Sequence, residues 1–259
     1  MKIIYSNKLS DFVNDDLKID LCIATKNSIN DLPSLIESIK NQTLLDNTRL
    51  LVADSKSVDG TLEILKKIPF TKIISFSDNS PEEGFNKLLI KDQTNLKIII
   101  SSDDYLSNNY LDEYNKAARN LINKGIKKFI LLPKFYKNFG NKSFNFDLPL
   151  PIFFLNFIGI CRGIGFGIYN NYGALPSFNE NIKYASDFEL LIRCLKNGYY
   201  FKYVECKYYH SKRGRSAINW FIALKEEKAI SLKYNKNPLI KIFIKILFDI
   251  KYIYKLIRT

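Results

Sequence analysis

The sequence has few of the residues that build zinc clusters or disulfide frameworks. Its 259 residues include four cysteines and one histidine, and no two cysteines form a C-x-x-C pair. A zinc cluster is therefore not expected, and the lack of a disulfide pattern is consistent with a reducing compartment. Cys22 and Cys194 lie in apolar stretches, so we expect buried thiols at both positions.

Long apolar runs are also missing. No stretch reaches about 18 uncharged apolar residues, which a membrane-spanning helix requires, and the first twenty residues have no signal-peptide pattern. Because 46% of the residues are hydrophobic, the chain can bury a substantial core and is not disordered. With no internal repeat and no low-complexity linker, we expect one domain, residues 1–237, followed by a tail, residues 238–259.

Acidic residues are outnumbered by basic ones. The chain has 39 Lys and Arg against 26 Asp and Glu, a formal net charge of +13. Such an excess implies an anionic partner, and nucleic acid, anionic lipid and phosphate-bearing substrates all qualify. An AT-rich genome also produces this bias, so the composition alone does not choose among them.

What the sequence does contain is an alternation of apolar runs with helical patterns. Short runs that are typical of buried strands occupy residues 19–24, 50–53, 72–75 and 96–100. Helical patterns separate them, and this alternation predicts βαβ units and a parallel sheet. Farther along, the patterns predict strands at 128–132 and 200–204 and a helix at 184–197.

Two adjacent carboxylates, Asp103 and Asp104, follow the run at 96–100. The carboxyl end of a strand is the rim at which open α/β sheets bind ligands. Neighbouring like charges are hard to keep ionised unless a cation relieves them, and oxygen ligands suit magnesium or manganese. An Asp-rich turn is the alternative, because serine and aspartate also favour turns. The pair alone does not decide between a metal site and a turn.

Three further motifs give the acidic pair a context. In chain order the four are Thr25-Lys26-Asn27, a D-x-x-S-x-D-G-T segment from Asp54 to Thr61, Asn86-Lys87, and Ser102-Asp103-Asp104. In this order and spacing they resemble the family 2 glycosyltransferases, which have the GT-A nucleotide-sugar fold. The segment at 173–187 is similar to one in bacterial surface-polysaccharide members. The resemblance covers about residues 20–216 and implies an α/β fold, with a Rossmann-like, mostly parallel sheet flanked by helices.

The resemblance also implies a site. Asp104 would bind a divalent cation, Mn²⁺ or Mg²⁺, that bridges the diphosphate, and Asp103 would contact the ribose or the metal through water. Thr25 and Asp54 would line the nucleoside pocket. The other donor-binding candidates from these motifs are Asn27, Ser55, Asn86, Lys87 and Ser102. Ser55 and Ser102 stand where some relatives have an acid.

Asp187 is the expected general base. The resemblance places the base at this position. Asp187 precedes the apolar stripe of the predicted helix at 184–197, so it would face the cleft, where the base would accept the proton of the acceptor hydroxyl. A first-turn carboxylate that only favours the helix dipole is the structural alternative, and Glu189 is a neighbouring candidate. A single displacement with Asp187 as base would invert the anomeric configuration.

The segment after 200–204 offers further contacts. His210 is the single histidine. Some GT-A enzymes draw a metal ligand or a diphosphate contact from this region, and a structural histidine is the alternative. Arg213 and Arg215 are candidates for binding phosphate, unless they belong to a solvated basic loop.

The tail, residues 238–259, has the pattern of a basic amphipathic helix. If it is helical, eight apolar side chains share one face and most lysines lie opposite, where Ile244, Phe248, Tyr252 and Leu256 intrude. A helix of this kind suits an anionic membrane surface. Packing on the domain core is the alternative.

The leading hypothesis is a sugar transferase at the cytoplasmic face of a bacterial cell membrane. It would move sugar from a nucleotide-diphosphate donor to a lipid-linked saccharide acceptor in surface-polysaccharide biosynthesis. A nucleotidyltransferase would have a similar acidic metal site, but it would need a glycine-rich basic loop after the first strand, and Thr25-Lys26-Asn27-Ser28 is not one. A non-enzymatic basic module that binds membrane or nucleic acid is the third hypothesis. It would need no paired carboxylates at a strand end, and no motif matches a nucleic-acid-binding fold.

Overall fold

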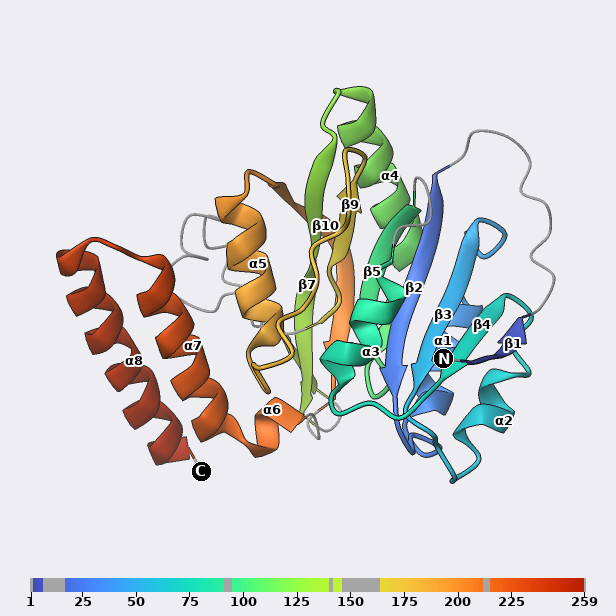
Figure 1. Cartoon of the computed structure of the whole chain (residues 1–259), viewed down its shortest axis with the longest axis horizontal. Coiled ribbons are helices and arrows are strands. Elements are labelled where there is room, and N and C mark those ends of the chain that lie inside the picture. The colour runs from blue at the N-terminus through green and yellow to red at the C-terminus, as the bar shows by residue number, and fades with distance from the viewer. Residues whose placement is uncertain are drawn as a thin grey trace.

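Residues 2–6, 17–90, 95–139, 142–145, 164–211 and 215–258 are described by the computed structural model. Their strands form one ten-stranded sheet in the order β1-β4-β3-β2-β5-β9-β7-β10-β6, with β8 paired to β7 (Figure 1). The strands are β1 (Lys2–Ser6), β2 (Lys18–Thr25), β3 (Thr48–Asp54), β4 (Thr71–Ser75), β5 (Asn95–Ser101), β6 (Tyr105–Leu106), β7 (Lys128–Phe139), β8 (Lys142–Asn145), β9 (Gly167–Asn170) and β10 (Tyr200–His210). The helices are α1 (Leu32–Lys40), α2 (Thr61–Leu65), α3 (Pro81–Leu88), α4 (Tyr110–Asn123), α5 (Ser186–Lys196), α6 (Arg215–Ile218), α7 (Trp220–Tyr234) and α8 (Pro238–Arg258).

The amino-terminal half of the sheet is parallel, as the alternating pattern predicts. β4, β3, β2 and β5 pair in parallel, and α1, α2 and α3 form the crossovers between them. The four predicted runs each lie inside one of these strands. The α/β fold class is therefore confirmed, and the carboxyl ends of these four strands meet at one edge of the sheet.

Beyond β5 the sheet is mixed. β9 lies between β5 and β7 and is antiparallel to both, whereas β7 and β10 are parallel. No pattern predicts β9, because this strand has four residues and includes glycine and asparagine, which strands disfavour. β10 extends well past the predicted 200–204. The prediction ended too early because exposed charged residues alternate with the buried Cys206 and Tyr208 beyond that point, so the apolar run is interrupted.

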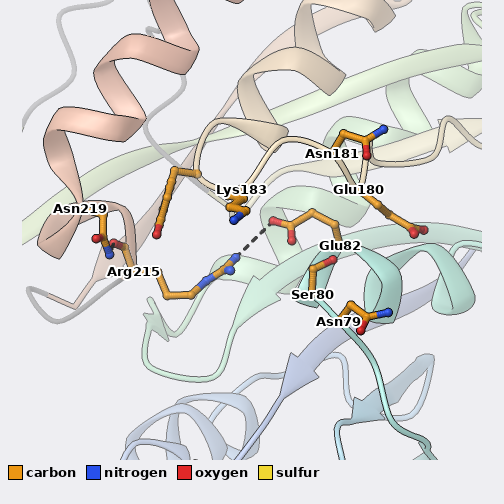
Figure 2. Close-up of a pocket in the computed structure, with 9 residues that line it drawn as sticks. Asn79, Ser80, Glu82, Glu180, Asn181, Lys183, Arg215 and Asn219 are labelled. Atoms are coloured by element: carbon orange, nitrogen blue, oxygen red, sulfur yellow. Dashed lines mark hydrogen bonds and ion pairs between the residues drawn. The ribbon is translucent and has the colours of Figure 1, made fainter.

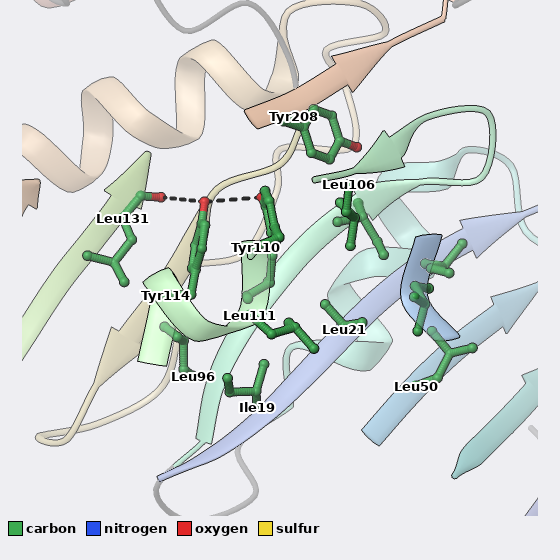
Figure 3. Packing of buried hydrophobic residues seen from close by; sticks show 14 of the residues in the cluster. Ile19, Leu21, Leu50, Leu96, Leu106, Tyr110, Leu111, Tyr114, Leu131 and Tyr208 are labelled. Atoms are coloured by element: carbon green, nitrogen blue, oxygen red, sulfur yellow. Dashed lines mark hydrogen bonds between the residues drawn. The ribbon is translucent and has the colours of Figure 1, made fainter. Parts of the chain in front are cut away.

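Two apolar layers fill the space between the sheet and its helices. One lies under α1, α2 and α4 and the other under α3 and α5. In the first layer the buried rings of Tyr110 and Tyr114 pack together, and the Tyr114 hydroxyl donates to the Leu131 carbonyl at 3.4 Å (Figure 3). A Cβ atom at Gly167 would lie 2.8 Å from the Tyr114 ring, so glycine in β9 permits this close packing.

A buried charge cluster crosses the three central strands. Asp20 on β2 accepts hydrogen bonds from Arg49 on β3 at 2.7 and 2.9 Å and from Lys97 on β5 at 2.9 Å. The register causes this arrangement, because Asp20 stands opposite Arg49 on one side and Lys97 on the other. Burial acts to raise the pKa of Asp20, but the two cations hold it below its usual value.

Replacing Asp20 with asparagine is expected to destabilise the fold by about 3–5 kcal/mol, because the charge that compensates two cations is removed. Chemical denaturation at pH 7 measures the loss. Since the pKa of Asp20 is lowered in the fold, its contribution is present above the unfolded pKa and disappears as the pH falls through the folded value. The control Glu113→Gln breaks an exposed pair with Lys116 and is expected to cost less than about 1 kcal/mol. Equal losses in both variants would contradict this account.

α7 and α8 lie side by side at one end of the molecule, and α7 separates α8 from α5 (Figure 1). Ile244 and Phe248 are buried in a small cluster with Leu224, against which Trp220 and Tyr252 also pack. Three of the four residues that interrupt the polar half of the tail therefore form its contact with α7. In the part of the chain that the structure describes, no helix is long and apolar enough to cross a membrane.

The broad apolar face of α8 is left exposed. Its side chains that are at least half exposed are Leu239, Ile242, Phe243, Ile246, Ile250, Ile253, Tyr254 and Ile257. The tail thus packs on the preceding helix through one narrow seam and presents its main apolar face to the outside. The division of the chain into residues 1–237 and 238–259 stays a prediction.

Candidate active site

Two loops at the carboxyl edge of the sheet are tied together by the D-x-x-S-x-D-G-T segment. One loop follows β2 and the other follows β3. Backbone N–H groups of the first donate to side chains of the second, from Asn27 to Ser57 at 2.8 Å, Ser28 to Thr61 at 2.8 Å and Ile29 to Asp59 at 3.0 Å. Gly60 has a φ of 96°, which favours glycine. The motif therefore needs small hydroxyl and carboxylate side chains at this spacing, because each one fixes a different peptide group.

The predicted nucleoside-binding residues lie next to one another at this edge. Asp54 is fully buried, and its carboxylate accepts hydrogen bonds from the Ser57 N–H at 3.1 Å and the Ser75 hydroxyl at 2.9 Å. Thr25 stands opposite Asp54 in the register of β2 and β3. The Ser55 N–H donates to the Thr25 carbonyl at 2.9 Å. Asp54 thus shapes the loop, and its contact with a nucleoside stays a prediction.

Asp104 and His210 meet although 106 positions separate them in the chain. β6 pairs antiparallel with β10, which places Tyr105 opposite Tyr209, and the two rings stack at 4.5 Å. The residues that flank this pair are therefore adjacent. His210 Nδ1 lies 3.1 Å from Asp104 Oδ2. The Ser211 N–H donates to Asp104 Oδ1 at 2.8 Å. The structure brings together the two predicted metal ligands.

The other two members of the acidic motif have different partners. Ser102 Oγ lies 3.2 Å from Ser28 Oγ, in the loop after β2. Asp103 accepts a hydrogen bond from the Ser101 hydroxyl. Burial, together with the neighbouring Asp104 carboxylate, raises the pKa of Asp103. A cation or a hydroxyl donor close to Asp103 would therefore stabilise its ionised form.

The ligands offered by Asp104 and His210 fit a divalent ion that the substrate helps to hold. They are a carboxylate oxygen and an imidazole nitrogen, a combination that manganese accepts. Among the described residues, no group of three or more His, Cys, Asp or Glu side chains forms a metal site. Ions such as magnesium commonly take one or two carboxylates from the protein and phosphate oxygens from the substrate. The residues present therefore fit a metal whose coordination a diphosphate completes.

Asp187 lies in the first turn of α5. Burial raises the pKa of its carboxyl group to about 7. The Phe188 N–H, which donates to Asp187 Oδ1 at 2.8 Å, opposes this shift, and so does His210. Glu227 and Glu82 add to it through repulsion. A carboxylate whose pKa is near neutrality is well suited to act as a general base.

Glu189, the alternative base, is occupied by other partners. Its carboxylate accepts hydrogen bonds from Arg193 at 2.9 Å and from the Tyr234 hydroxyl at 2.5 Å. Burial acts to raise the pKa of Glu189, but these two partners hold it below its usual value. Asp187 is therefore the better candidate of the two.

Asn86 and Lys87 on α3 contact other parts of the protein. Asn86 Nδ2 donates to the Phe178 carbonyl at 3.0 Å and to Glu180 at 2.7 Å, and its Oδ1 accepts the Phe178 N–H at 2.6 Å. Lys87 Nζ donates to Glu83 at 2.9 Å. Asn86 therefore fixes the segment that leads into α5. The predicted contact of these two residues with the donor stays a prediction.

Of the two predicted phosphate-binding arginines, Arg215 is described and Arg213 lies outside the described residues. Arg215 opens α6, and its Nη2 lies 3.2 Å from Glu82 Oε1. Its side chain is 54% exposed, so it is accessible to a ligand.

A pocket of about 530 Å³ opens beside Glu82 (Figure 2). Its lining comes from the start of α3, the segment before α5, and α6 with the residue after it: Asn79, Ser80, Glu82, Glu180, Asn181, Lys183, Tyr184, Arg215 and Asn219. Sequence reasoning missed Glu82, because a first-turn glutamate is common in any helix. The only local signal is the string Ser80-Pro81-Glu82-Glu83, which marks a helix start.

Comparisons with known proteins agree with this geometry. The sequence pattern of the family described as Glycosyl transferase family 2 matches residues 20–121. No curated protein matches the chain. The structure of S. aureus TarS 1-349 in complex with UDP-GlcNAc has a TM-score of 0.64 and 19% identity, covering 88% of this chain and 70% of that one.

Two further solved structures have the same fold. The longer S. aureus TarS structure has a TM-score of 0.63 and 19% identity over 90% of this chain, which spans only 43% of TarS. The mannosyltransferase PcManGT from Pyrobaculum calidifontis, in complex with GDP-Man and Mn²⁺, has a TM-score of 0.62 and 12% identity, covering 96% of this chain and 73% of that one. Identities this low show the fold alone. The segment 20–121, which matches the pattern of the family 2 glycosyltransferases, contains all four motifs, and the chain has the GT-A fold.

Proposed function

We propose that this glycosyltransferase moves a sugar from a nucleotide-diphosphate donor to a saccharide acceptor and inverts the anomeric configuration. The observation that carries the proposal is the position of Asp187, whose pKa is raised to about 7 and is influenced by His210. This electrostatic effect of His210 on Asp187 supports a base near the Asp104–His210 pair. The complexes of TarS with UDP-GlcNAc and of PcManGT with GDP-Man support a nucleotide-sugar donor.

In the proposed reaction, the acceptor oxygen attacks the anomeric carbon from the side opposite the diphosphate. Its proton passes to a carboxylate oxygen of Asp187. The bond between the anomeric carbon and the diphosphate oxygen breaks, and its electron pair leaves with the nucleoside diphosphate. Because one attack occurs from the opposite side, the configuration at the anomeric carbon inverts.

We propose Asp104 and His210 as the protein ligands of Mn²⁺ or Mg²⁺. When bound, such an ion stabilises the negative charge that gathers on the leaving diphosphate. We assign to Asp103, whose pKa is raised by burial and by Asp104, a contact with the ribose or, through water, with the ion. The Mn²⁺ in the PcManGT complex supports this assignment.

A panel of nucleotide sugars tests the proposed function. Each is incubated with the protein in Mn²⁺, in Mg²⁺ and in EDTA, and release of the nucleoside diphosphate is measured with and without alkyl glycoside acceptors. We expect metal-dependent release from at least one donor, and NMR of the transfer product is expected to show an inverted anomeric centre. The proposal fails if no donor binds or reacts, and a product of retained configuration would refute the single displacement.

We also propose that the acceptor is lipid-linked and that the enzyme works at the cytoplasmic face of the cell membrane, in surface-polysaccharide synthesis. The exposed apolar face of α8 supports this, together with the exposed Ile218, Phe221 and Ile222 on α6 and α7. Residues 215–258 contain ten Lys and Arg but three Asp and Glu. An apolar face beside a surplus of positive charge suits an anionic lipid surface.

Two substitutions on the exposed face test membrane binding. The double variant Ile246→Asp/Ile250→Asp is expected to lower sedimentation with phosphatidylglycerol-containing vesicles by at least about tenfold, because two apolar side chains are lost and two negative charges appear. Both side chains are more than half exposed, so the fold should persist. The control Val58→Asp/Ile90→Asp changes two exposed apolar residues elsewhere and should bind as the wild type does. Equal sedimentation of all three proteins would count against the membrane role of α8.

A further inference from the structure

Glu82 is a buried carboxylate, and one of its two oxygens has no hydrogen-bond partner among the described residues. Its side chain is 5% exposed. Oε1 accepts hydrogen bonds from the Ser186 hydroxyl at 2.8 Å and from Arg215 at 3.2 Å. Oε2 is buried and has no hydrogen-bond partner among the described residues. An unsatisfied buried oxygen is costly, and a water or a ligand commonly supplies the missing donor.

The pocket beside Glu82 has the chemistry of a saccharide site. Its lining residues include Asn79, Ser80, Asn181 and Asn219 (Figure 2). Tyr184 lines it as well. Amides and hydroxyls both donate and accept hydrogen bonds, as sugar hydroxyls do. The pocket volume of about 530 Å³ lies in the range of small-molecule sites.

Glu82 also lies beside the proposed catalytic centre. It binds Ser186, which directly precedes Asp187, and its charge is felt at the Asp187 carboxylate. On the other side of the pocket, Glu180 is held in place by Asn86. A sugar held in this pocket would therefore lie next to the base, between fixed walls.

We infer that Glu82 accepts a hydrogen bond from a hydroxyl group of a substrate saccharide, and that the pocket beside it is the subsite of that sugar ring. This inference rests on the proposed function. The last torsion of a glutamate side chain rotates easily, so either carboxylate oxygen can face the pocket. The ring belongs to the donor or to the acceptor, and the affinities distinguish these two sources.

Glu82→Gln tests the inference, because it replaces an acceptor oxygen by an NH₂ donor. Calorimetry measures the affinity for the nucleotide sugar that the panel selects and for the matching nucleoside diphosphate. If the ring is the donor's, the nucleotide sugar loses about 10- to 100-fold in affinity while the nucleoside diphosphate is unaffected. If it is the acceptor's, both affinities are unchanged and KM for the alkyl glycoside acceptor rises by a similar factor.

Two companion variants complete the test. Asn181→Trp enlarges an exposed residue of the pocket lining and leaves the hydrogen bonds of Glu82 in place. Because the larger side chain fills the pocket, we expect the same loss of affinity, or the same rise in KM, as for Glu82→Gln. This variant keeps the test available if Glu82→Gln does not fold. Glu37→Gln, on the exposed side of α1, should change nothing. The inference is overturned if a folded pocket variant has wild-type affinities for both nucleotides and a wild-type KM for the acceptor. It is also overturned if the variant loses affinity for the nucleotide sugar and for the nucleoside diphosphate by the same factor. Failure of the proposed function differs, because the wild type would then bind no nucleotide sugar.

Discussion

Replacing Asp187 with asparagine is expected to lower kcat for sugar transfer by about 100- to 10,000-fold, because asparagine cannot take the proton of the acceptor hydroxyl. Single-turnover and steady-state assays at saturating donor measure the effect. The affinity for the nucleotide sugar should stay within about twofold, since Asp187 acts on the acceptor. The matched control is Glu189→Gln on the same helix. It breaks the contacts with Arg193 and Tyr234, so it should lower stability and keep kcat per folded molecule.

The same substitution is expected to stabilise the fold at alkaline pH. The pKa of Asp187 is about 7 in the folded protein, against 3.8 for an ordinary aspartate, so the ionised form is disfavoured by folding. This penalty grows as the pH rises from the unfolded pKa and is complete above the folded one. It amounts to at most roughly 4 kcal/mol. Asp187→Asn should therefore melt at a higher temperature than the wild type at pH 8.5 and at about the same temperature near pH 4.

The pH dependence of the wild type gives an independent measurement. Since the base must be ionised, log kcat/KM should rise with a slope near one below about pH 7 and level off above it. The residual activity of Asp187→Asn should not show this rise of log kcat/KM with pH. A limb near pH 4, or a variant that loses activity together with stability at every pH, would contradict the assignment of Asp187 as the base.

The carboxyl edge of the sheet could be predicted from the sequence because its signals are local. Each of the four motifs directly follows a buried run or sits in the next helix, so the parallel topology alone brings them to one edge. The D-x-x-S-x-D-G-T segment is a local signal of the same kind. Its Ser57 and Asp59 side chains accept hydrogen bonds from backbone N–H groups of the loop after β2, which the parallel topology places beside the loop after β3.

The rest of the site depends on contacts between distant segments, which no local pattern contains. His210 reaches Asp104 because a two-residue strand, β6, pairs with the end of β10, and two residues are too few to give a periodic signal. Glu82 lines a pocket only because α6 and the segment before α5 come together with the start of α3. In the tail, the sequence shows four apolar residues among the charges of the polar face but not their partners, and Ile244, Phe248 and Tyr252 make the contact with α7.

Replacing Asp104 with asparagine is expected to lower kcat/KM for the nucleotide sugar by at least about 100-fold and to remove its dependence on Mn²⁺, because the negative charge that would hold the ion is lost. The asparagine oxygen can still accept the Ser211 N–H, and its amide can still reach His210, so the local geometry is kept. Donor affinity is measured by calorimetry with Mn²⁺ and with EDTA. The partly exposed Asp112, which accepts a hydrogen bond from Thr43, provides the control Asp112→Asn.

The double variant Asp104→Asn/His210→Asn shows whether Asp104 and His210 act together. If both hold one ion, the double variant should be no worse than the poorer single variant, since the effects of side chains that share a ligand are not additive. Membrane binding offers a second readout, because it is proposed for α8 and not for the edge that carries Asp104. Asp104→Asn should therefore sediment with anionic vesicles as the wild type does. Turnover with unchanged Mn²⁺ dependence in Asp104→Asn would refute the metal assignment, and loss of turnover and vesicle binding together would indicate unfolding.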